Sequence, residues 1–168
     1  MARKPPAGTP ATRVLEASGV AWSAHPYAHD PRAASYGLEA AHALGVAPEQ
    51  VFKTLLADCD GRLVVGVVPV DAQLDLKALA KAVAAKKAQM ADPSQAERAT
   101  GYVVGGISPL GQKRALPTVV DDSARRWETV YVSGGRRGLD VGIAPGDLVT
   151  LTDATLAAIA RRPAPSAT

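Results

Sequence analysis

Three polar residues stand in stretches of the chain that are otherwise apolar or rich in glycine. They are Lys53 within Val51–Leu56, Ser133 before two glycines, and Asp140 within an apolar run. A buried charge is costly unless an opposite charge or a hydrogen bond meets it. Lys53 therefore either extends to solvent along its methylene groups or meets an anionic or carbonyl group in a pocket.

A glycine-rich stretch over residues 101–113 could supply further ligand contacts. Its Gly105-Gly106 pair lets the backbone approach a ligand closely and offers N–H groups that no side chain obstructs. The stretch is not a P-loop, because the spacing before Lys113 is wrong. If the strands share a sheet, these glycines lie beside the three polar residues. The sequence then predicts a pocket for an anion or an ester.

No residue stands out as a catalytic nucleophile. Cys59 is next to the turn at Asp60-Gly61, with no histidine nearby in the sequence. Ser108 and Ser133 are flanked by Gly or Pro, and the chain has no Gly-x-Ser-x-Gly motif. These observations predict a ligand-binding cleft and leave open whether the cleft is catalytic.

Tyr27 and two histidines lie on one side of a predicted strand over residues 20–29. On a strand, the four-residue spacing of His25 and His29 is too wide for a shared metal ion. We therefore expect no metal and no cofactor, and we assign both histidines to an exposed polar face. Tyr27 is a candidate for ligand contact, because its long hydrogen-bonding side chain lies beside the predicted cleft.

Apolar periodicity, together with the positions of Gly and Pro, predicts a mixture of helices and strands. In the first half we expect a helix from Thr9-Pro10 to Gly19, a strand over 20–29, a helix over 35–44, and a hairpin of strands 51–57 and 63–70. Both hairpin strands are nearly continuous in Val and Leu, so we expect them to be covered on both faces.

In the second half we expect helices over 74–83 and 91–100, strands over 117–121 and 129–133, a glycine-rich turn over 133–138, a strand over 139–143, a turn at Pro145-Gly146-Asp147, a brief strand, and a closing helix over 154–161. No internal repeat is present. This order of elements predicts a mixed α/β protein.

The chain has 168 residues, enough for one domain with a proper core. We expect the domain over residues 9–162, with flexible termini over 1–8 and 163–168. The single cysteine excludes an internal disulfide and a zinc site built from cysteines, which favours a reducing, cytoplasmic location. No apolar run approaches the length of a membrane span, and the basic N-terminus lacks the apolar core of a signal peptide.

Positive charge is concentrated in one region. Residues 77–137 carry 11 Lys and Arg against 5 Asp and Glu, whereas the net charge of the whole chain is +3. Such a region could attract a polyanion by long-range steering, or it could be an ordinary solvated face. Charge alone does not decide between these two interpretations.

Several motifs together resemble the YbaK/EbsC family, a group of trans-editing aminoacyl-tRNA deacylases. They are TPATRVLE, HPYAHDP, QVFKTLL, AQLDLKALAKA, KKAQMADPSQAERATGYVVGGISPLGQK, YVSGGRRGLD and PGDL. In this order they span nearly the whole chain and are most similar to the Cys-tRNA(Pro) deacylase branch. The resemblance implies one α/β domain, with a mixed β-sheet curled into a partial barrel and flanking helices.

The resemblance also assigns roles to particular residues. The family's essential lysine falls on Lys53 and its Gly-Gly loop on Gly105 and Gly106, which implies that they stabilise an oxyanion. The family's substrate-binding residues fall on Tyr27, Ser133 and Asp140. Asp140 could orient the lysine or the substrate ammonium. The sequence departs from the family only in a short hairpin turn near residue 60 and in the cysteine before it.

The resemblance further implies hydrolysis of cysteine mischarged onto proline tRNA, by attack of the substrate's own thiol on its ester. The expected partners are aminoacyl-tRNA and, transiently, prolyl-tRNA synthetase; no membrane is expected. The basic region would meet the acceptor stem through its phosphates. Two alternatives stay open: a deacylase for Ala- or Ser-tRNA, and a non-catalytic module that binds tRNA or nucleotides.

Overall fold

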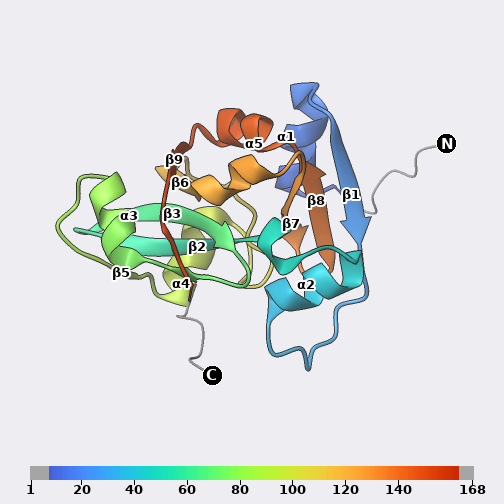
Figure 1. The fold of residues 1–168 in the computed structure, drawn as a ribbon, viewed down its shortest axis with the longest axis horizontal. Coiled ribbons are helices and arrows are strands. Elements are labelled where there is room, and N and C mark those ends of the chain that lie inside the picture. The colour runs from blue at the N-terminus through green and yellow to red at the C-terminus, as the bar shows by residue number, and fades with distance from the viewer. Residues whose placement is uncertain (1–7, 163–168) are drawn as a thin grey trace.

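A computed structural model describes residues 8–162 as a single α/β domain (Figure 1). The helices are α1 Pro10–Ser18, α2 Tyr36–Leu44, α3 Leu76–Ala82, α4 Pro93–Thr100 and α5 Pro145–Thr152, with short 3-10 turns η1 Pro48–Gln50 and η2 Asp122–Arg126. The strands are β1 Trp22–Pro26, β2 Phe52–Cys59, β3 Arg62–Pro69, β4 Gln73–Leu74, β5 Ala88–Met90, β6 Thr118–Asp121, β7 Val130–Arg136, β8 Leu139–Ile143, β9 Thr155–Ala157 and β10 Ala160–Arg161.

The strands form three sheets. The largest has the order β5-β2-β3-β6-β9. It is mixed, since neighbouring strands among β3, β6 and β9 are parallel, whereas neighbouring strands among β5, β2 and β3 are antiparallel. An antiparallel sheet has the order β1-β8-β7, and β10 pairs with β4. A parallel bridge between Val51 and Tyr131 joins the two larger sheets. The predicted mixed α/β fold is therefore confirmed, and its sheet does not close.

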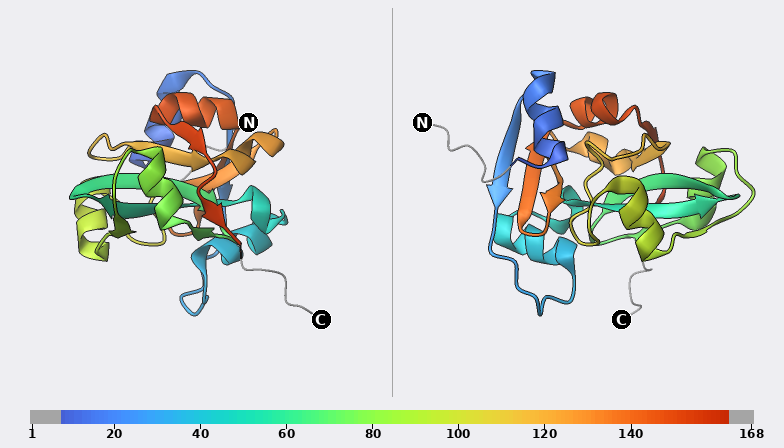
Figure 2. Two further views of the ribbon diagram at one scale, coloured as in Figure 1. Left: turned by 60° about the vertical axis from the view of Figure 1, so that its left-hand side comes forward. Right: turned by 180° about the vertical axis from the view of Figure 1, so that it is seen from behind.

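The β2-β3 hairpin is covered on both faces, as its composition predicts. Phe52 and Val65 belong to the main core, which also contains Ala96 of α4. Val64 and Val68 belong to a second core with residues of α3. Helices α3 and α4 accordingly lie on opposite faces of the hairpin (Figures 1 and 2). The hairpin is the layer around which both cores form.

Capping residues set the helix ends that the sequence predicts. The Thr9 side chain accepts a hydrogen bond from the backbone N–H of Thr12 at the start of α1. Gly19 ends α1 in the left-handed conformation, with φ +78°. Helix α3 starts later than expected, because Asp75 caps it while Gln73 and Leu74 pair with β10.

The prediction for residues 145–161 is wrong. Residues 145–152 form helix α5 rather than a turn and a brief strand, and β9 and β10 occupy the place of the expected closing helix. The cause is a long-range contact. The buried Asp121 carboxylate accepts hydrogen bonds from the backbone N–H groups of Ile159 and Ala160, each at 2.9 Å. These bonds, together with the pairing of β9 with β6 and of β10 with β4, hold the segment extended despite its apolar periodicity.

Two smaller differences concern the sheets. Strand β5 was not predicted; its residues pair with the end of β2, from Ala57 to Cys59. Strand β7 continues to Arg136 through an irregularity after Ser133, so the expected glycine-rich turn is shorter. Pairing with β2 positions strand β5, and pairing with β8 extends strand β7; local composition reveals neither pairing.

The expected flexible segments 1–8 and 163–168 lie outside the described residues, apart from Gly8. Among residues 8–162, no helix has the length and apolarity needed to cross a bilayer.

Replacement of Asp121 by Ala should lower the free energy of unfolding by about 2–4 kcal/mol, because several buried hydrogen bonds to a carboxylate are lost together. Chemical denaturation measures this loss. The matched control is Asp122→Ala, which removes a neighbouring exposed carboxylate and should change stability by less than about 0.5 kcal/mol. Equal effects of the two substitutions would contradict this role of Asp121.

Candidate active site

Strand β2 has one edge that is only partly paired. Strand β5 covers it only at Ala57–Cys59, and the backbone N–H of Ala91 reaches the Leu56 carbonyl at 3.0 Å. At the other end, Val51 forms a single bridge with Tyr131 of β7, a strand that also pairs with β8 from Val130 onward. The edge between these two ends faces a cavity of about 400 Å³.

Five of the six residues predicted from the sequence line this cavity: Tyr27, Lys53, Gly105, Ser133 and Asp140. They come from four separate parts of the chain. Because β2 and β7 run parallel from the Val51–Tyr131 bridge, Lys53 and Ser133 each lie two residues beyond it. The bridge therefore sets the relative position of the lysine and the serine.

Asp140 lies between Ser133 and His25 in one row across the β1-β8-β7 sheet. With neighbouring strands about 4.8 Å apart, Ser133 and His25 are roughly 10 Å apart. The Nε2 atom of His25 instead lies 2.7 Å from the Ser23 hydroxyl oxygen. A serine, a histidine and an aspartate are thus neighbours, but the histidine is not placed to activate the serine.

Asp140 is 6% exposed, and its carboxyl group belongs to none of the ion pairs or side-chain hydrogen bonds found within residues 8–162. Burial raises its pKa to about 7. A buried carboxyl group without a cation favours a ligand that brings one. Within this cavity, Asp140 is the group best suited to receive an ammonium.

Lys53 is half-buried and lies in no ion pair within the described part of the chain. Burial lowers the pKa of its ammonium, and the charge of Asp71 opposes this shift. No contact joins Lys53 to Asp140, so the geometry favours the second of the two roles expected for Asp140, contact with the substrate ammonium. The cavity thus holds an ammonium and a carboxyl group that do not pair with each other.

Tyr27 is held by its backbone, whose N–H donates to the Gly138 carbonyl at 2.8 Å. Burial, together with the negative charges of Asp140 and Glu39, raises the pKa of its hydroxyl to about 12. The side chain therefore stays a neutral phenol at physiological pH. It can donate a hydrogen bond to a ligand in the cavity.

The two glycines of the predicted loop have different environments. Gly105 lines the cavity with φ +89°, and a Cβ atom there would lie 2.8 Å from the Tyr36 ring. The Gly106 N–H instead donates to the Val103 carbonyl at 2.8 Å and closes a turn. Within residues 8–162, no hydrogen bond uses the Gly105 N–H. Gly105 is therefore the better candidate for donation to a ligand, and Gly106 shapes the turn.

The remaining sequence candidates lie elsewhere. Cys59 is 2% exposed in the second core, where burial and the charges of Asp58 and Asp60 raise its pKa. It is placed neither to attack a ligand nor to form a thiolate. His29 contacts Glu39 at 2.7 Å rather than belonging to a freely exposed face. Residues 8–162 contain no cluster of three or more His, Cys, Asp or Glu side chains suited to a metal ion.

Two further residues with polar side chains that sequence reasoning did not single out also line the cavity. The Thr54 hydroxyl is buried and has no hydrogen-bond partner within the described residues, an arrangement that is costly in a core. Tyr36 lies at the cavity wall, 39% exposed, with the Arg137 guanidinium 5.1 Å from its ring centroid. The one sequence feature that could have identified Thr54 is its position directly after Lys53 in an otherwise apolar strand.

Two curated relatives share much of this sequence. A protein of Enterococcus faecalis, named as a candidate Cys-tRNA(Pro)/Cys-tRNA(Cys) deacylase, EbsC, is 38% identical over 120 residues, which cover 71% of this chain and 73% of that protein. The proline–tRNA ligase of Moorella thermoacetica is 34% identical over 109 residues, 61% of this chain but only 18% of the ligase. The similarity to the ligase thus concerns one part of a much larger enzyme.

The fold has a close counterpart among solved structures. A crystal structure described as a candidate trans-editing enzyme for prolyl-tRNA synthetase superimposes with a TM-score of 0.80 at 24% identity, covering 92% of this chain and 99% of the other. In addition, residues 30–151 match the family described as an aminoacyl-tRNA editing domain. This match includes Lys53, the glycine loop, Ser133 and Asp140, and the chain therefore belongs to the aminoacyl-tRNA editing domain family.

Proposed function

We propose that this protein removes a small mischarged amino acid from tRNA, with Cys-tRNA(Pro) as its main substrate. One observation supports this proposal most. The cavity presents an unpaired lysine and an unpaired carboxyl group, but none of its side chains is placed as an activated nucleophile. A cysteinyl ester supplies the missing nucleophile itself.

In this proposal each end of the amino acid meets one of the unpaired groups. The α-ammonium binds the Asp140 carboxylate, and this contact makes ionisation of the carboxyl group favourable. The ester carbonyl oxygen points to the Lys53 ammonium and the Gly105 N–H, which stabilise the negative charge that develops on it. Tyr27 and Ser133 border the same space and supply hydroxyl groups for orientation.

The reaction then needs only the substrate's own atoms. The cysteine sulfur forms a bond to the ester carbon, the bond from that carbon to the terminal ribose oxygen breaks, and the thiol proton ends on that oxygen. The products are a cyclic thiolactone and free tRNA. An attack within one molecule gains a proximity advantage, so the protein has to hold the ester in place rather than provide a nucleophile.

The cavity wall supports a small amino-acid side chain. Ala91, Ala96 and Ile107 line it together with Thr54. Alanine and serine esters would fit the same space but lack a thiol, so their removal would require an activated water. A deacylase for Ala- or Ser-tRNA therefore stays the alternative within this reaction class, and a non-catalytic tRNA- or nucleotide-binding module would bind without turnover.

The similarity to proline–tRNA ligases and to a structure described as a trans-editing enzyme supports tRNA(Pro) as the carrier. A small cavity can contact only the amino acid and the end of the tRNA that carries it. We therefore propose that prolyl-tRNA synthetase supplies the selectivity for tRNA(Pro) in a transient complex.

Replacement of Lys53 by Met should reduce kcat/KM for Cys-tRNA(Pro) by at least about 100-fold, because the oxyanion loses its cation. The substitution keeps the methylene stem and removes a half-buried charge, so the melting temperature should not fall. Release of tRNA from radiolabelled Cys-tRNA(Pro) measures the rate. Lys113→Met, a lysine outside the cavity, should retain full activity.

Activity should also depend on the ionisation of Asp140. Since the pKa of this carboxyl group is about 7 in the unliganded protein, kcat/KM should rise with pH through neutrality as the carboxylate forms. In Asp140→Asn the rate should be low and this rise should disappear. A variant that keeps the wild-type pH profile would show that Asp140 does not hold the ammonium.

The same carboxyl group should affect stability in a defined direction. Its folded-state pKa lies above the ordinary value near 3.9, so the folded protein disfavours the charged form. Its contribution to stability is complete below about pH 4 and is lost as the pH rises to about 7. Asp140→Asn should therefore raise the melting temperature more at pH 8 than at pH 4, as measured by calorimetry.

A further inference from the structure

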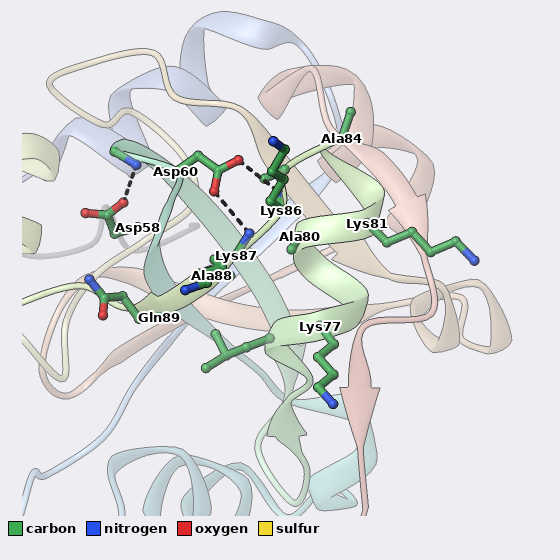
Figure 3. A pocket seen from close by; sticks show the side chains of 13 residues that line it. Asp58, Asp60, Lys77, Ala80, Lys81, Ala84, Lys86, Lys87, Ala88 and Gln89 are labelled. Carbon is green, nitrogen blue, oxygen red and sulfur yellow. Dashed lines mark hydrogen bonds between the residues drawn. The ribbon is translucent and has the colours of Figure 1, made fainter.

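A second hollow, of about 910 Å³, lies on the side of the molecule formed by α3, the β2-β3 turn and β5 (Figure 3). Its walls carry four lysines from two short segments: Lys77 and Lys81 on α3, and Lys86 and Lys87 just before β5. All four are exposed, and none belongs to an ion pair within residues 8–162. The site described above does not include them.

The two carboxylates at this hollow accept hydrogen bonds from backbone N–H groups. Asp60 accepts hydrogen bonds from the N–H groups of Lys86 and Lys87, at 2.7 and 3.0 Å (Figure 3). Asp58 accepts one from Gly61 at 2.7 Å. Asp60 thereby fixes the segment that carries two of the lysines, and neither carboxylate forms an ion pair with a lysine ammonium. The four lysines outnumber the two carboxylates, so the walls carry a net positive charge. The hydrogen bonds to Asp60 hold the backbone of Lys86 and Lys87 in place.

The hollow and the cavity share no lining residue, but both reach strand β5. Ala88 and Gln89 line the hollow, whereas the next residue, Met90, lines the cavity. At about 3.3 Å per strand residue, the two sites adjoin rather than lie at opposite ends of the molecule. A chain of phosphates that ends in the cavity could therefore continue over the lysines.

We propose that this lysine hollow binds the phosphate backbone of the tRNA body while the aminoacylated end lies in the cavity. This inference rests on the proposed function. Lysine acts as a point charge toward phosphate and reads no base, so the contact should be independent of sequence and strongly dependent on salt. It would add affinity for the whole tRNA without taking part in the chemistry.

Two double variants test the proposal: Lys77→Ala/Lys81→Ala and Lys86→Ala/Lys87→Ala. The control, Arg125→Ala/Arg126→Ala, removes the same charge from exposed positions that line neither site. Fluorescence anisotropy with uncharged tRNA(Pro) at several salt concentrations measures binding. Each lysine variant should bind at least about tenfold more weakly and reduce the slope of log K against log salt by about 2. The control should match the wild type.

Turnover separates this proposal from the proposed function. The lysine variants should lose kcat/KM toward Cys-tRNA(Pro) through KM, yet hydrolyse a short cysteinyl ester of adenosine at the wild-type rate. No turnover of either substrate by the wild type would reject the deacylase function, while the binding experiment would still report on the hollow. Wild-type binding and salt slope in both lysine variants would overturn the proposal. So would weakened binding to prolyl-tRNA synthetase with unchanged binding to tRNA, which would assign the hollow to a protein partner.

Discussion

The partly unpaired edge of strand β2 is the constraint on which the rest of the site depends. A strand inside a sheet normally pairs along its whole length, but here β7 leaves β2 after one bridge, between Val51 and Tyr131, and β5 covers only the far end. The cavity occupies the space between these two contacts. Lys53 lies in this interval, so the gap in pairing is also what opens the lysine to a ligand.

The electrostatics of the cavity follow from the same geometry. Lys53 and Asp140 belong to different sheets and do not meet, so within residues 8–162 each remains without a counter-ion, and each has its pKa shifted against its charged form. Two unpaired groups of opposite sign are costly in an empty protein, and a ligand with an ammonium at one end and a polarised carbonyl at the other relieves both costs. An aminoacyl ester has this pattern, whereas a simple anion would satisfy only the lysine.

Much of this arrangement could be predicted from residue types. Lys53, Ser133 and Asp140 could be identified because each is polar where its neighbours are apolar or glycine. Gly105 could be identified because it belongs to a stretch with several closely spaced glycines, which is not compatible with a helix or a strand. What could not be predicted depends on particular hydrogen bonds that residue types alone do not reveal. The Val103 carbonyl occupies the Gly106 N–H, and the Asp121 carboxylate turns an apparently helical C-terminal segment into strands. Local periodicity contains no signal for either contact.

If the substrate provides its own nucleophile, blocking its thiol should prevent rapid release of tRNA. The measurement compares the rates at which the protein releases tRNA from Cys-tRNA(Pro) and from the same tRNA carrying S-methylcysteine, which retains the ammonium and the ester. Methylation should slow release by at least about 100-fold, because intramolecular attack is lost. Comparable rates for the two substrates would contradict it and indicate an activated water held by the cavity.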